Sequence, residues 1–118
     1  MTAGKFQRAL ENITRVRGVR GAMLVAGEDG LIVAESLMEG VKGKAVAALA
    51  ASLANRFRRV AEASATGYLQ FLHLQAFEGV ILTVPADSGV LVVALAEPKV
   101  NVGLVRLEML RAAEALAG

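Results

Sequence analysis

The stretch that decides the fold is Val90–Gly118, which reads VLVVALAEPKVNVGLVRLEMLRAAEALAG. Its first seven residues form a short, β-branched apolar run that ends at Glu97-Pro98-Lys99, a pattern typical of a buried strand. From Asn101 to Leu116, apolar residues recur at helical spacing with charged residues on the other side. The stretch therefore predicts a last sheet strand followed by one closing helix that covers the sheet.

The composition predicts that the chain associates with itself. Hydrophobic residues make up 55% of the 118 residues, and the mean hydropathy of +0.52 is high for one small domain. A membrane-spanning helix needs about 20 consecutive apolar residues, and the longest uninterrupted runs, Ala45–Ala51 and Val90–Ala96, are much shorter. We therefore expect no membrane insertion, and we expect the surplus apolar surface to be buried against a second copy.

Charge, cysteine and aromatic content narrow the choice of partners. The formal net charge of +2 is too small to indicate a nucleic-acid-binding protein, and aromatic residues at 4% are too few for a base-stacking surface. The chain contains no cysteine, so it has neither disulfides nor thiolate metal sites. No signal-peptide core follows Met1. We expect a cytoplasmic protein that does not bind nucleic acid.

The order of elements predicts a single α+β domain over residues 1–118 with a largely antiparallel sheet. Asp29-Gly30 and Ser88-Gly89 lie between apolar runs, as in tight β-hairpins. The expected elements are, in order, a helix containing Phe6–Val16, strands Ala22–Ala26 and Leu31–Ala34, a helix Val41–Ala63, strands Tyr68–Gln75, Gly79–Pro85 and Val90–Ala96, and a helix Asn101–Leu116.

The long middle helix is apolar on two sides. Its apolar stripe consists of Val46, Leu49, Leu53, Phe57 and Val60. The opposite side is occupied mostly by alanines, namely Ala47, Ala48, Ala51 and Ala54. Small side chains let two helices approach closely, so we expect the alanine side to pack against another helix. Alanine is also the best helix former, which is the simpler explanation of the same pattern.

No catalytic, cofactor-binding or metal-binding motif was found in the sequence. His73 is the only histidine and lies between two leucines, which favours a structural role. The segment Arg56-Phe57-Arg58-Arg59 is the best candidate for a functional surface. It fits either the C-terminal end of a helix dipole or a cationic patch for an acidic partner. We expect a binding or scaffolding protein rather than an enzyme.

Three segments resemble one known family, the Roadblock/dynein light chain domain. Val16–Ala34 is similar to its opening hairpin, Gly79–Ala96 to its last two strands, and Asn101–Ala113 to its closing helix. The resemblance spans nearly the whole chain and is to the bacterial type, which includes MglB-like regulators of small GTPases. It implies a five-stranded antiparallel sheet in α-β-β-α-β-β-β-α order, with the long middle helix on one face and the terminal helices on the other.

The resemblance also implies a function. Such domains form homodimers or heterodimers through the middle helix and third strand, and act as non-enzymatic adaptors for Ras-like small GTPases, as activators or scaffolds. The dimer interface it implies contains Ala47, Ala51, Ala54, Tyr68, Gln70 and Leu72. The GTPase-binding face it implies contains Lys44, Asn55, Arg56, Arg58 and Arg59. The alternative function is a small-molecule-sensing α+β domain.

Overall fold

The computed structural model describes residues 2–117 and has the expected α-β-β-α-β-β-β-α order. Most strands start or end within three residues of the expected positions. The elements are α1 (Thr2–Thr14), β1 (Val19–Ala26), β2 (Ile32–Leu37), α2 (Gly43–Ala63), β3 (Leu72–Gln75), β4 (Val80–Pro85), β5 (Val90–Ala96) and α3 (Val102–Ala117). The predicted fold class is confirmed.

The five strands form one antiparallel sheet in the order β2-β1-β5-β4-β3. The most continuously apolar strand, β5, lies at the centre, where both of its faces are covered. Its side chains alternate between the two faces, as in any strand. Val92, Ala94 and Ala96 pack with α1 and α3, whereas Leu91 and Val93 pack with α2.

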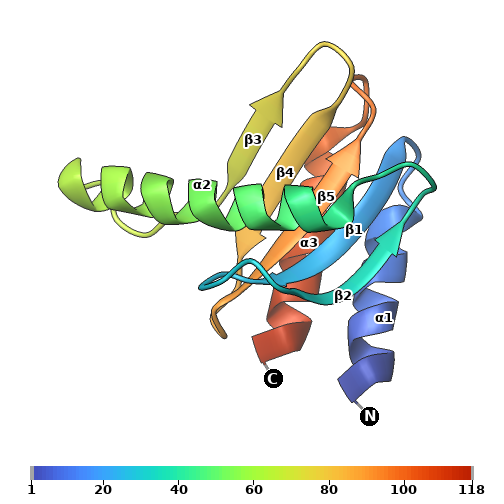
Figure 1. Ribbon diagram of the computed structural model, residues 1–118, viewed down its shortest axis with the longest axis horizontal. Coiled ribbons are helices and arrows are strands. Elements are labelled where there is room, and N and C mark those ends of the chain that lie inside the picture. Colours follow the sequence, from blue (N-terminus) through green and yellow to red (C-terminus); the bar gives the residue numbers. More distant parts are fainter. Residues whose placement is uncertain (1, 118) are drawn as a thin grey trace.

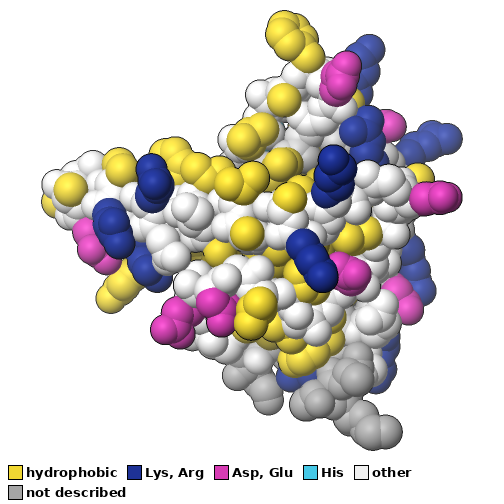
Figure 2. All heavy atoms as spheres, in the orientation of Figure 1, with side chains coloured by type: hydrophobic (Ala, Val, Ile, Leu, Met, Phe, Trp, Pro, Cys, Tyr) yellow, Lys and Arg dark blue, Asp and Glu magenta, His cyan; other side chains and the backbone are white. Residues whose placement is uncertain are grey.

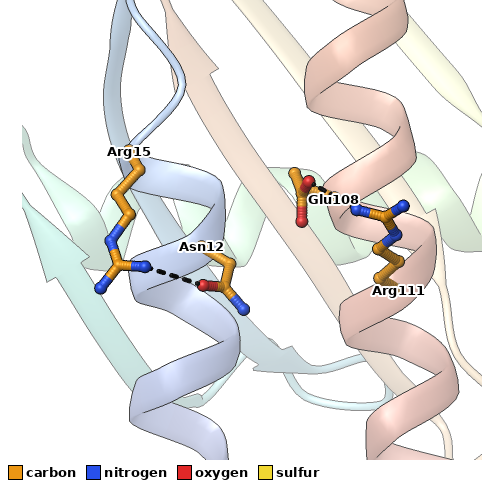
Figure 3. Close-up of polar contacts among 4 residues, drawn as sticks. All are labelled: Asn12, Arg15, Glu108 and Arg111. Atoms are coloured by element: carbon orange, nitrogen blue, oxygen red, sulfur yellow. Dashed lines mark hydrogen bonds and ion pairs between the residues drawn. The ribbon is translucent and has the colours of Figure 1, made fainter.

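Helices cover both faces of the sheet. Figure 1 shows α2 lying across one face, with α1 and α3 side by side on the other. Each face has its own hydrophobic core, and the larger one includes Leu10 and Ile13 of α1 with Val105 and Met109 of α3. Figure 3 shows one polar contact near each terminal helix: Asn12 of α1 with Arg15, just after the helix ends, and Glu108 with Arg111 on α3. Exposed pairs of this kind contribute little to stability.

Two hairpin tips are fixed to each other and to α2. The Gly27 N–H donates a hydrogen bond to the Gly89 carbonyl oxygen at 2.9 Å, and a Cβ atom on Gly27 would lie 2.9 Å from that same oxygen. Gly30 has a φ of +75°, and a Cβ atom there would lie 2.9 Å from the Cα of Ala48. Glycine is required at both places because the backbones approach so closely.

The third strand is shorter than the sequence predicted. Tyr68–Phe71 do not belong to β3, which begins at Leu72 opposite Thr83 of β4. Two residues earlier, the same register would place Gln70 opposite Pro85. Because proline has no N–H to donate to a strand ladder, it limits pairing at that point. Phe71 instead packs against the α1/α3 core, with the Arg106 guanidinium 4.6 Å from its ring centroid.

The orientation of α2 corrects a second prediction. Its alanine side packs against the chain's own sheet, not against a helix of a second copy. Ala47, Ala51 and Ala54 are buried together with Ala50. The sheet beneath them presents the larger side chains Met23, Val25, Leu91 and Val93. These fill the space between the layers, so the helix can lie close to the sheet only if its facing residues are small.

This packing predicts that Ala51→Leu destabilises the fold. The added atoms have no space against the sheet, and overpacking of this kind costs about 1–3 kcal/mol. Ala45→Leu, on the same helix but exposed, serves as the matched control, with an expected change within about 0.5 kcal/mol. Urea unfolding at equal protein concentration measures both. Equal effects of the two substitutions would show that the alanine side is not tightly packed.

Candidate interaction surface

The large apolar residues of α2 form an exposed stripe. Leu49 is 65% exposed, and Leu53, Phe57 and Val60 are also exposed, whereas Val46 is partly buried at the edge of the core. Figure 2 shows apolar side chains gathered along the side of the helix that faces β3. Exposed apolar patches of this kind mark interaction sites in soluble proteins. We call Leu49, Leu53, Phe57 and Val60 the α2 stripe.

The two edge strands of the sheet differ in how open they are to pairing. On β2, the register with β1 shifts between Leu24 and Val25, which leaves Val33 without a counterpart, and Glu35 places a charge in the middle of the strand. Bulges and charges both hinder pairing with another chain. By contrast, β3 pairs with β4 in regular register and contains no Lys, Arg, Asp or Glu. The open edge is therefore β3, next to the α2 stripe.

The other residues expected at the dimer interface lie near this edge. Leu72 is in β3 and partly buried against the α2 core. Tyr68, 95% exposed, and Gln70 lie in the segment that joins α2 to β3. His73 is exposed on β3, where its Nε2 lies 3.1 Å from Oε1 of Gln75. Leu74 and Phe77, two exposed apolar residues, lie at the far end of the same hairpin, and sequence reasoning missed Phe77.

A C-terminal cap ends α2 and fixes where the chain turns back toward β3. The N–H groups of Ala65 and Thr66 donate to the carbonyl oxygens of Glu62 and Ala61 at 3.1 and 3.0 Å. This is the pattern of a Schellman motif. Ala65 has a φ of +57°, the left-handed conformation that glycine most often occupies in such caps. The last turns of α2 therefore keep their helical form although no buried residue of α2 lies beyond Ala54.

The residues expected on the GTPase-binding face separate into structural and accessible ones. The Asn55 side-chain amide donates to the Gly27 carbonyl oxygen at 3.2 Å and accepts from Nη2 of Arg58 at 2.7 Å. Asn55 therefore ties α2 to the first hairpin, and Arg58 is held by Asn55. Arg56 and Arg59 are exposed and make no side-chain hydrogen bond or ion pair within residues 2–117. Lys44 is exposed near the other end of the helix.

An open groove of about 730 Å³ lies between the C-terminal part of α2 and the hairpin tips. It brings together Asn55, Arg58 and Arg59 with Tyr68 and with the Gly27 and Gly89 turns. The acidic residues Glu28 and Asp87 also line it.

Among residues 2–117, no three His, Asp or Glu side chains gather closely enough to hold a metal ion. None of the helices in that range has the length and hydrophobicity to cross a membrane.

The arrangement defines a class of protein, an α+β domain whose single antiparallel sheet has one helix on one face, two on the other and one open edge. A family model described as the Roadblock/LC7 domain matches residues 5–96. The chain belongs to the Roadblock/LC7 domain family, which confirms the resemblance seen in its sequence.

Individual relatives and solved structures are similar to the chain over most of its length. The uncharacterized protein MJ1340 of Methanocaldococcus jannaschii is 37% identical over 109 residues, 92% of this chain and 94% of that protein. A solved structure described as MglB with tetrameric arrangement has a TM-score of 0.87 at 25% identity and covers 97% of this chain and 86% of its own. The Roadblock/LC7 domain from Streptomyces avermitilis has a TM-score of 0.84 at 19% identity, covering 93% and 92%.

The polar tie between α2 and the first hairpin predicts that Asn55→Ala lowers stability by about 1–2 kcal/mol, because the Gly27 carbonyl loses its side-chain donor. Asn12→Ala is the matched control. Its side chain is exposed and accepts one hydrogen bond, from Arg15 just after the end of α1, at 3.4 Å, and its loss should cost less than about 0.5 kcal/mol. Thermal and urea unfolding test both variants. If Asn55→Ala is as stable as Asn12→Ala, the tie does not contribute to folding.

Proposed function

We propose that this chain is a non-enzymatic homodimer that acts in the cytoplasm as an adaptor and regulator of a Ras-like small GTPase. The observation that carries the proposal is the continuity of the exposed α2 stripe with the unpaired edge of β3. Membership of the Roadblock/LC7 family and the likeness to MglB structures support a regulatory role in a small-GTPase system.

Burial of apolar surface is the driving force of the proposed dimer. An antiparallel pairing of β3 with the β3 of a second copy satisfies the backbone groups that an edge strand leaves unpaired. The same two-fold rotation brings the α2 stripe of each copy against that of the other. The interface is then self-complementary, as in most homodimers, and it closes on itself after two subunits. Because β2 is bulged and charged, growth of the sheet stops there.

The proposed GTPase-binding surface is the part of α2 that dimerisation leaves accessible. Around the helix, Lys44, Asn55 and Arg58 lie on the flank away from the stripe, where Asn55 and Arg58 meet the first hairpin. Arg56 and Arg59 lie on the outer side, away from the sheet. Basic side chains lie over both ends of the helix in Figure 2. A cationic surface of this kind favours an acidic surface on the partner and accelerates encounter.

For the dimer, Leu53→Glu should produce folded monomers. A carboxylate in the middle of the α2 stripe is costly to bury between two copies, and we expect the dissociation constant to rise by at least about 100-fold. Leu31→Glu, exposed near the opposite sheet edge, should leave the dimer intact. Sedimentation velocity measures the assembly and circular dichroism checks the fold. A Leu53→Glu protein that still sediments as a wild-type dimer would place the interface elsewhere.

For the partner, the immobilised chain should capture a Ras-like GTPase from its own cell, with a preference between the GDP-bound and GTP-analogue-bound forms. Arg56→Glu and Arg59→Glu should each weaken capture by about tenfold, because they replace attraction by repulsion. Arg15→Glu, just after the end of α1 on the other face of the sheet, is the control. Hydrolysis rates with and without the chain separate activation from recruitment. Absence of capture in both nucleotide states refutes the proposal.

A further inference from the structure

On the α2 face of the sheet, no helix covers the end of the β3–β4 hairpin. Leu74 pairs with Ile81, which packs against α2, so the Leu74 side chain lies on that same face and is 45% exposed. Phe77, in the turn between β3 and β4, is fully exposed at 102%. Figure 1 shows why: α2 crosses the sheet near the start of β3, at the end away from this turn.

The hairpin end has no helix over it, whereas the last turns of α2 have no sheet beneath them. The last buried residue of the helix is Ala54, and nine residues follow it before the helix ends at Ala63. Figure 1 shows this part of α2 extending beyond β3, past the edge of the sheet. It carries Phe57 and Val60, the exposed C-terminal half of the α2 stripe. We call residues 56–63 the α2 overhang.

We propose that each α2 overhang lies on the β3–β4 hairpin of the partner subunit, where the partner's Phe77 anchors it by packing against Phe57 and Val60. The inference rests on the homodimer proposed above. A two-fold axis at the β3 edge, perpendicular to the sheet, reverses the direction of β3. The strand end crossed by α2 in one subunit therefore lies beside the end that carries the β3–β4 turn in the other. The uncovered hairpin and the overhang come together, twice per dimer.

The chemistry of the two surfaces is complementary. Two phenylalanines and a valine supply a small apolar centre, and large aromatic side chains contribute strongly to the energetics of protein interfaces. Glu78 follows Phe77 in the turn, and Arg20 contacts its backbone carbonyl rather than its carboxylate. The overhang carries Arg56, Arg58 and Arg59 against the single acidic residue Glu62. The turn and the overhang therefore carry net charges of opposite sign.

Cross-linking tests the contact directly, because the natural chain has no cysteine. A tagged Phe57→Cys chain is mixed with an untagged Phe77→Cys chain and treated with a short bis-maleimide. The expected product is a covalent dimer that contains one chain of each kind. The matched control replaces Phe77→Cys by Leu31→Cys, an exposed residue near the opposite sheet edge, and should give no such product.

Dissociation constants provide the second readout. Phe77→Ala and Phe57→Ala should each weaken the dimer by about 10–100-fold. The double variant should be weakened by less than the product of the two effects, because contacting residues are not independent. A stable wild-type dimer with no 57–77 cross-link, or with Phe77→Ala bound as tightly as wild type, overturns this contact and leaves the dimer standing. A wild-type chain that stays monomeric overturns both proposals.

Discussion

The close contact between the alanines of α2 and the large side chains of the sheet determines most of what this molecule presents to its surroundings. Met23, Val25, Leu91 and Val93 already fill the layer under the helix, so only small residues can face them. The larger apolar residues of the same helix must then point elsewhere. An exposed stripe of leucine, phenylalanine and valine is the consequence, and apolar surface of this kind gains free energy when a partner buries it. The core packing and the interaction surface are therefore two results of a single arrangement.

The difference between the two sheet edges determines on which side of the molecule this apolar surface can be buried together with an open strand. A bulge at Val33 and the charge of Glu35 hinder pairing along β2, whereas β3 is regular and uncharged. The apolar stripe lies on the β3 side of α2 and not on the β2 side. An association that uses both the stripe and the open edge can occur only on one side of the molecule. This asymmetry favours a closed pair over an extended array of sheets.

Local patterns predicted the elements well and their packing less well. The hairpins at Asp29-Gly30 and Ser88-Gly89, the central strand β5 and helix α3 follow from short-range turn and periodicity rules, and the structure has them all. The orientation of α2 does not follow, because both its alanine side and its leucine side are apolar and periodicity cannot tell which one meets the sheet. The early start assigned to the third strand ignored Pro85 on a neighbouring strand. Phe77 was missed because a single apolar residue in a turn forms no periodic pattern.

The rotational setting of α2 about its own axis needs an additional constraint, since a helix with alanines on much of its surface could roll on the sheet at little cost. The first hairpin supplies that constraint on the flank opposite the stripe. Gly30 lies against the backbone of Ala48, so closely that even a methyl group would not fit. About two turns later along the helix, the Asn55 amide donates a hydrogen bond to the Gly27 carbonyl oxygen. The Gly30–Ala48 backbone contact and the Asn55–Gly27 hydrogen bond together fix the rotation of α2 about its own axis. With that angle fixed, the stripe can point only toward β3. Gly27 is in turn bonded to Gly89, so the turn between β4 and β5 also helps to hold the interaction surface in place.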